Sequence, residues 1–293
     1  MAFNIQTFKT RALSATVFAV IMLGGLLWNH WSFFILFSVI HFGCWMEFQK
    51  LMGLINSDYQ KTSPLHRYGV MVAGWAFMLF MCGEGFSIGN FRLHDAGALL
   101  LLASGIILPL MLVVMKKNLS LKSLQYSLSG LIYISVSWGM MMSIRNVGLM
   151  EQAGSIVEDK GWIIPVVLIS SIWINDTMAY IVGSFIGKTP FSKISPKKTW
   201  EGTAGGALLC IAVVSFAGNK IYPALGLTTY IAISTIAAIA GTAGDLLESK
   251  LKRMAKVKDS GHIMPGHGGF LDRFDSLLLS TPFVWVYVIL FPL

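Results

Sequence analysis

The stretch that decides the fold class is residues 12–28, which read ALSATVFAVIMLGGLLW. Only Asn29 and His30 separate it from a second apolar run, Trp31–Met46, so the two runs predict a tight helical hairpin. A chain inside hydrocarbon must pair its own backbone N–H and C=O groups, and an α-helix does so within one segment. Because a helix needs ~20 residues to cross a bilayer, we expect these runs to extend into the adjacent polar turns.

Similar runs recur along the chain and predict an all-α, polytopic integral membrane protein with about nine spans. The composition agrees, because 55% of residues are apolar and 12% are charged, against ~25% charged in soluble domains. A mean hydropathy of +0.68 excludes a disordered chain and disfavours an ordinary soluble enzyme. The three cysteines have no CxxC spacing, so we expect neither a disulfide framework nor a zinc site. The further runs are Tyr68–Cys82, Ala96–Met115, Leu124–Ser143, Trp162–Gly183, Thr203–Gly218, Leu227–Gly244 and Leu277–Leu293.

The basic residues predict the orientation of these spans. With the N-terminus in the cytoplasm, eighteen of the 22 Lys and Arg residues fall in cytoplasmic segments, and the outside loops keep only Arg92, Arg145, Lys160 and Lys220. This split follows the positive-inside rule. The net charge of +8 therefore indicates basic loops and anionic lipid or phosphate ligands, and we expect no nucleic acid as a partner.

The polar motifs divide the chain into two predicted parts. Residues 1–160 form N-terminal membrane helices without a recognised motif, and residues 161–293 form a C-terminal catalytic membrane region. The second part carries two cytoplasmic loops, 188–202 and 248–275, which hold ten of the eighteen cytoplasmic basic residues. We expect the chemistry in these two loops.

One acidic residue, Asp176, lies within a predicted span. A charge at bilayer depth costs ~2.5–3.5 kcal/mol on insertion scales, so such residues usually face a polar interior and have a role. Tyr180 follows one turn later on the same face. A substrate or metal contact is the functional interpretation; a helix-packing aspartate bonded to Tyr or Ser is the alternative.

A second motif, SPKKTWEG, occupies residues 195–202. Ser195 is expected to cap a helix and Pro196 to be its first residue. The free N–H groups of a helix N-terminus suit phosphate, and two adjacent lysines add positive charge. The alternative is a basic loop that only obeys the positive-inside rule. Gly202 and Gly206 have the GxxxG spacing that allows another helix to approach closely.

A third motif lies where an apolar span ends. Asp245, Glu248, Ser249 and Lys252 are spaced i, i+3, i+4 and i+7, so on a helix they share one face. An amphipathic helix end with a Glu248–Lys252 pair would explain part of this pattern. It would not explain an aspartate at the membrane edge.

The fourth motif, KDSGHIMPGHGGFLDRFDS, covers residues 258–276. Its Pro-Gly and Gly-Gly pairs predict a loop whose backbone can approach a ligand closely. Asp272 and Asp275 are i, i+3 neighbours at the start of the last helix. Paired carboxylates beside phosphate-binding lysines suggest Mg²⁺, and a solvated acidic first turn is the alternative. His267 is interpreted as a hydrogen-bonding residue of the loop in preference to a metal ligand.

The residues from Ser249 to Asp275, in the pattern SxLKRx4KDxG…PxHGGFxDRFD, closely resemble the signature of the phosphatidate cytidylyltransferases, the CDP-diacylglycerol synthases. The stretches around Asp176, over residues 195–202 and over residues 244–249 resemble further blocks of that family in the same order. The resemblance covers residues 173–276, with Met264 departing from the expected Leu, Ile or Phe.

The resemblance implies transfer of the cytidylyl group of CTP to phosphatidate, giving CDP-diacylglycerol and pyrophosphate in phospholipid biosynthesis. The paired carboxylates and lysines predict Mg²⁺ as cofactor for this reaction, and the number of carboxylates permits a second cation. We predict Asp245 and Asp272 as metal ligands. The predicted catalytic residues are Asp245, Asp272, Asp275, Asp176 and Lys252. The predicted substrate-binding residues are Lys188, Lys197, Lys198, Thr199, Glu201, Glu248, Ser249, Arg253, Lys258, Asp259, His267, Gly268, Gly269 and Arg273.

Two rival functions remain at this stage. A CTP-dependent polyprenol or phytol kinase would share the membrane setting but would phosphorylate an alcohol. A transporter would place its buried charge near mid-membrane and show repeated halves, whereas most acids here cluster at one cytoplasmic edge. The expected partners are CTP, phosphatidate and bilayer lipid, and a homodimer is left open. The expected location is a bacterial inner membrane, with the active site facing the cytoplasm.

Overall fold

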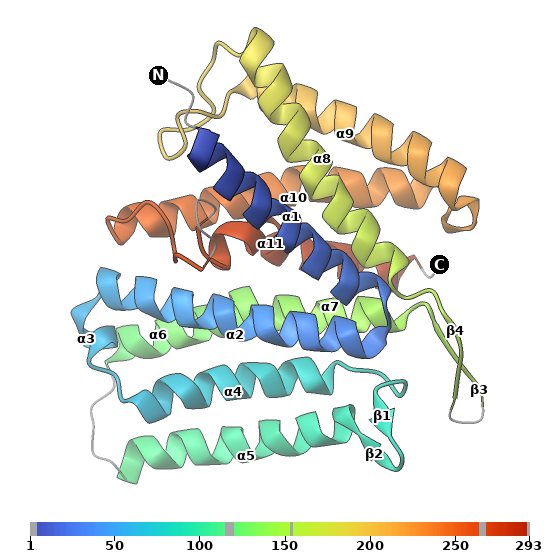
Figure 1. Ribbon diagram of the computed structural model, residues 1–293. Coiled ribbons are helices and arrows are strands. Elements are labelled where there is room, and N and C mark those ends of the chain that lie inside the picture. The colour runs from blue at the N-terminus through green and yellow to red at the C-terminus, as the bar shows by residue number, and fades with distance from the viewer. Residues whose placement is uncertain (1–4, 115–119, 153–154, 264–267, 292–293) are drawn as a thin grey trace. The chain divides into compact units, whose positions relative to one another are not determined.

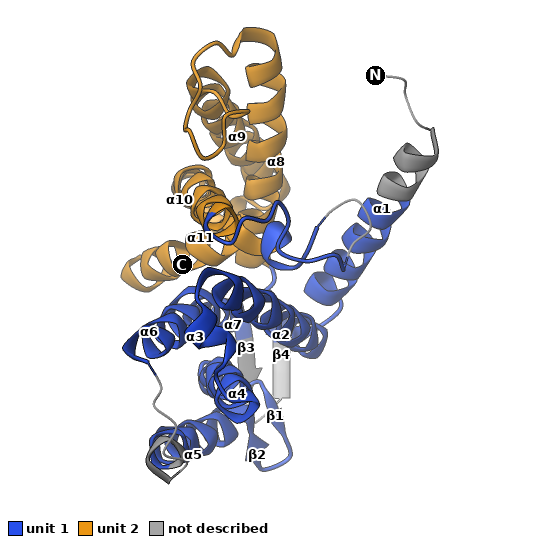
Figure 2. Ribbon diagram, turned by 90° about the vertical axis from the view of Figure 1, so that its left-hand side faces the viewer, with its two compact units in different colours: residues 1–162, 254–273 blue, residues 163–253, 274–293 orange. Residues whose placement is uncertain are grey.

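The computed structural model describes residues 5–114, 120–152, 155–263 and 268–291 (Figure 1). They form two compact units (Figure 2). Unit 1 comprises residues 1–162 and 254–273, and unit 2 comprises residues 163–253 and 274–293. The first boundary lies close to the sequence-based boundary at residue 160, and the chain then returns to unit 1 for one segment. The expected division of roles between the two predicted parts stays a prediction.

Unit 1 is built mainly from helices joined by short turns. Asn29 produces the first of these turns, because its side chain accepts a hydrogen bond from the Ser32 N–H at 2.8 Å while the Ser32 hydroxyl accepts one from the Asn29 N–H. The predicted helical hairpin is therefore confirmed. The helices are α1 (Ile5–Leu27), α2 (His30–Ile55), α3 (Ser57–Gln60), α4 (Pro64–Phe80), α5 (Leu93–Val114), α6 (Leu121–Gly130), the π-helical turn η1 (Leu131–Val136) and α7 (Ser137–Asn146).

Large aromatic side chains fill the core of unit 1. Phe37 and Trp138 are fully buried, and their ring centroids lie 5.2 Å apart. The Trp45 indole N–H donates to the Ser135 hydroxyl at 2.9 Å, which joins α2 to η1. Two short antiparallel hairpins lie in loops and were not predicted from the sequence. They pair β1 (Ser87–Ile88) with β2 (Phe91–Arg92), and β3 (Leu149–Gln152) with β4 (Ser155–Asp159).

Unit 2 contains four long helices and one short 3-10 turn. The helices are α8 (Ile163–Ile186), α9 (Trp200–Ile221), α10 (Leu227–Met254) and α11 (Leu271–Leu290), and η2 (Pro223–Leu225) joins α9 to α10. Helices α8 and α9 lie side by side. A Cβ on Gly206 would lie 2.6 Å from the Ala179 backbone N, and the Cα of Gly202 lies next to Gly183. The close helix approach predicted from the GxxxG spacing is confirmed.

The fold is that of an all-α polytopic membrane protein. Seven helices in the described part of the chain are long and apolar enough to span a bilayer. They cover His30–Ile55, Leu93–Leu110, Leu121–Asn146, Ile163–Ile186, Trp200–Ile221, Leu227–Met254 and Leu271–Leu290. The other two predicted spans fall on shorter helices, namely α4 with 17 residues and the apolar part of α1, Leu13–Leu27.

Candidate active site

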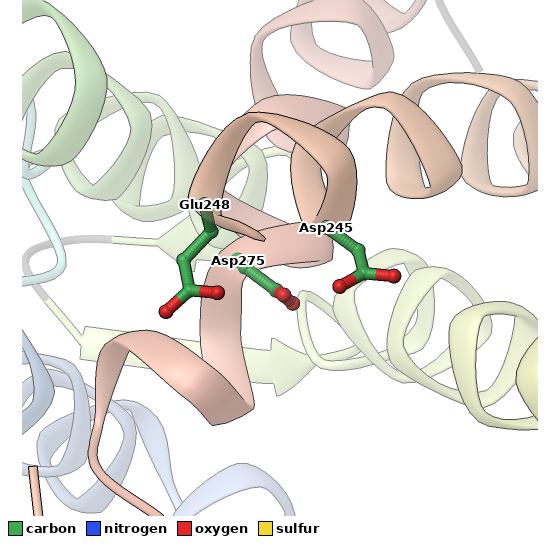
Figure 3. Close-up of side chains that lie close together, drawn as sticks. All are labelled: Asp245, Glu248 and Asp275. Atoms are coloured by element: carbon green, nitrogen blue, oxygen red, sulfur yellow. The ribbon is translucent and has the colours of Figure 1, made fainter. Parts of the chain in front are cut away.

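Three carboxylates converge in unit 2, as Figure 3 shows. Asp245 and Glu248 extend from α10 and Asp275 extends from α11, and one oxygen of each lies within 4.8 Å of the others. Glu248 is fully buried, and Asp275 is 8% exposed. Three like charges at this spacing and burial repel one another strongly unless a cation neutralises them. A hard cation such as Mg²⁺, which prefers oxygen ligands, fits this donor set.

Small residues bring the two helices together beside the carboxylates. A Cβ on Gly244 would collide with the backbone carbonyl oxygen of Asp275. One turn earlier, a Cβ on Gly241 would lie 3.4 Å from both the Ser276 Cβ and the Ser280 Oγ. Because Gly244 immediately precedes Asp245, this close approach holds the Asp245 and Asp275 side chains next to each other.

Basic residues balance part of this negative charge. Lys198, which precedes α9, forms an ion pair with the Oδ2 atom of Asp245. The Lys252 Nζ lies 2.5 Å from the Glu248 Oε2. Ser249 donates to the Asp245 Oδ1 at 3.4 Å, which confirms the predicted shared face on α10. Asp176 of α8 also bears on the site, since its charge repels that of Asp275.

The loop that carries Lys198 folds back on itself between α8 and α9. The Lys198 carbonyl accepts a hydrogen bond from Phe191 N–H at 2.8 Å, and Trp200 N–H donates to the Thr189 carbonyl at 2.9 Å. Glu201 accepts hydrogen bonds from the Lys188 N–H at 3.1 Å and from the Thr189 hydroxyl at 2.7 Å. Two of the residues predicted to bind substrate, Thr199 and Glu201, therefore shape the loop that presents Lys198.

The predicted start of this helix was wrong. Helix α9 begins at Trp200, and its cap is Thr199, whose hydroxyl accepts the Gly202 N–H at 3.1 Å. Pro196 lies instead in a turn closed by the hydrogen bond from Lys198 N–H to the Ser195 carbonyl, at 3.1 Å. Proline favours the second position of such a turn as strongly as the first turn of a helix, and the Thr199 cap decides between them.

A second polar cluster lies in unit 1, and it joins the segment between α10 and α11 to the first turn of α11. The Asp272 Oδ2 accepts hydrogen bonds from the Ser260 N–H at 2.9 Å and the Gly269 N–H at 2.8 Å, and it lies 2.9 Å from the Ser260 Oγ. Gly268 has a φ of +81°, as expected for a glycine-dependent turn. One oxygen of this predicted metal ligand thus holds the loop that leads into α11.

Sequence reasoning missed one residue of this second cluster, Glu47. It lies on α2, in the part of the chain without a recognised motif. Its carboxylate accepts hydrogen bonds from Phe270 N–H and Leu271 N–H, both at 2.9 Å, and from the Ser260 hydroxyl at 2.7 Å. The signal that could have found it is an acidic residue near the end of a long apolar run.

The other predicted site residues differ in their exposure, and one lies outside the described structure. Gly269 is buried next to the Glu47 carboxylate. Lys188, Lys197, Arg253, Lys258, Asp259 and Arg273 are exposed. His267 lies outside the described residues.

Comparison with known proteins supports the resemblance. Residues 9–291 match the profile described as the cytidylyltransferase family. The chain belongs to this family. Both polar clusters lie within the matched region, which covers nearly the whole of this cytidylyltransferase family member.

Individual relatives agree with the family match. The chain is 29% identical over 288 residues to the phosphatidate cytidylyltransferase of Staphylococcus saprophyticus, covering 96% of this chain and 99% of the relative. It is 42% identical over 121 residues to that of Bacillus subtilis, covering 41% and 45%. It is 38% identical over 128 residues to the chloroplastic phosphatidate cytidylyltransferase 4 of Arabidopsis thaliana, covering 44% and 33%. In these last two family members, the matched segment spans less than half of the relative.

Proposed function

We propose that this chain transfers the cytidylyl group of CTP to phosphatidate, with CDP-diacylglycerol and pyrophosphate as products. The observation that carries the proposal is the cluster of Asp245, Glu248 and Asp275 with Lys198 and Lys252 beside it, in a chain of the cytidylyltransferase family. Acidic groups suited to a divalent cation, next to lysines suited to phosphate, are what a reaction between two polyanions needs.

The reaction requires positioning more than proton transfer. A phosphate oxygen of phosphatidate attacks the α-phosphorus of CTP, and the bond from that phosphorus to the oxygen bridging to the β-phosphate breaks, releasing pyrophosphate. Because the second pKa of a phosphate monoester is ~6, the nucleophile is already largely ionised and no strong general base is needed. The main contributions are alignment and neutralisation of charge.

Residues of this chain supply that neutralisation. Lys198 pairs with Asp245 and Lys252 pairs with Glu248, so positive charge lies beside the carboxylate cluster, where nucleotide phosphates can contact it. Exposed Lys197 and Arg253 of unit 2 add further positive charge for phosphate binding, and a phosphate contact by Lys258 of unit 1 stays a prediction. Magnesium, when bound, supplies a Lewis acid that offsets charge on the phosphate oxygens. The role of Asp272 as a metal ligand stays a prediction.

The proposed location follows from the seven membrane-spanning candidates and the charge distribution. We place the N-terminus and the active site in the cytoplasm of a bacterial cell, at its inner membrane, so that CTP arrives from the cytosol and phosphatidate from the bilayer. A homodimer stays a prediction, which mass measurement in detergent would test.

The test is turnover of labelled CTP by purified protein in detergent. We expect CDP-diacylglycerol and pyrophosphate only when phosphatidate is added. A phosphorylated polyprenol or phytol, formed with release of CDP, would instead support a kinase. No labelled lipid product from either acceptor would overturn both enzymatic assignments.

A further inference from the structure

The Glu47 carboxylate holds the loop that carries much of the family signature. We call the described residues 255–263 and 268–270 the signature loop, and they lie in unit 1 together with Glu47. The Glu47 Oε1 accepts the Phe270 N–H at 2.9 Å, and its Oε2 accepts the Leu271 N–H at 2.9 Å. These N–H groups belong to the start of α11 and have no partner within that helix. A carboxylate there makes charge-assisted hydrogen bonds and also interacts favourably with the helix dipole.

The glycines of the signature loop leave room for this carboxylate. A Cβ on Gly261 or on Gly269 would collide with the Glu47 carboxylate oxygens. On α2 itself, a Cβ on Gly43 would collide with the Phe270 ring, which lies against that helix. Three positions without a side chain therefore surround one contact between α2 and the signature loop.

The same contact reaches Asp272 through one hydroxyl. The Ser260 Oγ lies 2.7 Å from the Glu47 Oε2 and 2.9 Å from the Asp272 Oδ2. Asp272 in turn accepts the Ser260 N–H and the Gly269 N–H. Glu47 and Asp272 thus share Ser260 as a hydrogen-bonding partner, and the two carboxylates together hold Ser260 close to residues 269–271.

We propose that Glu47 is a positioning residue, which acts on the reaction by fixing the signature loop and the first turn of α11. This rests on the proposed function. The Glu47 oxygens already accept hydrogen bonds from N–H and O–H donors of the loop and the first turn of α11. They also carry the same sign of charge as CTP and phosphatidate. Glu47 therefore affects the reaction by holding the loop in place and does not contact CTP. By fixing the first turn of α11, Glu47 orients the Asp272 side chain and determines the position of Arg273 on that turn.

The test is the Glu47→Gln variant, with Glu84→Gln as matched control. The amide keeps the length of the side chain but offers one acceptor oxygen where the loop needs two. Glu84 lies in the same unit, is 79% exposed and pairs only loosely with Arg92, at 3.7 Å. We expect kcat for cytidylyl transfer to fall at least ~10-fold in Glu47→Gln, with KM for CTP changed by less than ~3-fold, and both constants unchanged in Glu84→Gln.

Hydrogen exchange separates this proposal from the proposed function. In Glu47→Gln, the amides of Phe270 and Leu271 should exchange at least ~10-fold faster, while those of α4 and α5 keep their protection. Exchange is measured without substrate, so it judges the contact even if the wild-type protein transfers no cytidylyl group. Unchanged exchange at Phe270 and Leu271, or faster exchange with wild-type kcat, would overturn the proposal. Faster exchange throughout unit 1 would mean that Glu47 is needed for the stability of the whole unit, and this result would also overturn the proposal.

Gly261→Ala disturbs the same contact from the loop side and leaves Glu47 unchanged, so it tests the proposal even if Glu47→Gln fails to fold. Gly261→Ala should lower turnover and loop protection, because its methyl group collides with the Glu47 carboxylate. In a Glu47→Ala background that collision is removed, so Gly261→Ala should have little further effect. Equal effects of Gly261→Ala in both backgrounds would contradict the contact.

Discussion

Lys198 and Asp245 form an ion pair that links the loop before α9 to the carboxylate cluster of α10. One partner is a residue that the sequence predicts to bind phosphate, and the other is a residue predicted to bind a metal. Neither side chain is fully buried, since 30% of the lysine and 26% of the aspartate are exposed. The pair is therefore accessible to solvent, and in the proposed reaction the phosphates of CTP replace the carboxylate as the partner of Lys198.

Loss of this lysine should reduce transition-state stabilisation. We expect Lys198→Ala to lower kcat/KM for CTP at least ~10-fold, about 1.4 kcal/mol, and Lys197→Ala to do the same. Lys193→Ala, an exposed lysine of the same loop, is the matched control and should leave kcat/KM unchanged. Wild-type kinetics in both the Lys197 and Lys198 variants would mean that this loop contributes only to membrane orientation.

Removing one buried charge from the cluster should separate catalysis from folding. Asp275→Asn keeps the shape of the side chain but relieves its repulsion by Asp245 and Asp176. We expect folded, membrane-inserted protein with very low cytidylyl transfer, and a Tm without Mg²⁺ equal to or above that of the wild type. The paired measurements are turnover and thermal melting. Near-normal turnover would remove Asp275 from the site.

Removal of the metal should abolish turnover and lower the stability of the wild-type protein. Wild-type turnover should vanish with EDTA and return with Mg²⁺. Saturating Mg²⁺ at 100 times its Kd should stabilise the wild type by ~2.7 kcal/mol, and this shift should be absent in Asp245→Asn. Turnover that survives thorough chelation would show that the carboxylate cluster serves another purpose.

The close contact between α8 and α9 should be sensitive to a single methyl group. Gly206→Ala places a Cβ 2.6 Å from the Ala179 backbone N, so we expect a loss of about 1–3 kcal/mol in stability. Gly105→Ala is the matched control, because no atom lies within 4 Å of the added Cβ on α5. The control should be neutral or stabilising by up to ~1 kcal/mol. Melting of both variants in one detergent is the measurement, and equal Tm values would contradict the tight packing.

The orientation can be tested by cysteine labelling. The native cysteines Cys44, Cys82 and Cys210 are buried, so background labelling should be low. Lys220→Cys and Lys256→Cys place thiols at exposed positions on the predicted outer and cytoplasmic sides. An impermeant reagent added to intact cells should label the first and not the second. Labelling of both from one side would overturn the orientation.

Local patterns in the sequence were sufficient to predict the apolar helices and the close approach of another helix at Gly202 and Gly206. In the part of the chain that the structure describes, each of the nine apolar runs lies mainly in a helix, because hydrocarbon leaves the backbone little alternative. Gly202 with Gly206, and Gly268, could also be predicted, since close approach and positive φ each demand glycine. The shared face of Asp245 and Ser249 followed from helical periodicity alone.

Contacts between distant segments could not be predicted in this way. Glu47 and Leu271 are 224 residues apart, and no local pattern couples them. The position of Asp275 beside Glu248 depends on the contact of Gly244 with α11, which only the packed helices reveal. The start of α9 was misplaced for a different reason: Ser195 and Thr199 are both good caps, and the surrounding loop selects the second.

The contact between Glu47 and the start of α11 has a consequence for the order of biosynthesis. At ~5–20 residues per second, translation needs roughly 10–45 s to add the 224 residues that separate Glu47 from Leu271. Throughout that interval α2 has been synthesised, but the Phe270 and Leu271 N–H groups that bind the Glu47 carboxylate have not. Completion of unit 1 therefore has to wait until all of α8, α9 and α10 have been synthesised, so the first half of the chain matures only after most of the second half has left the ribosome.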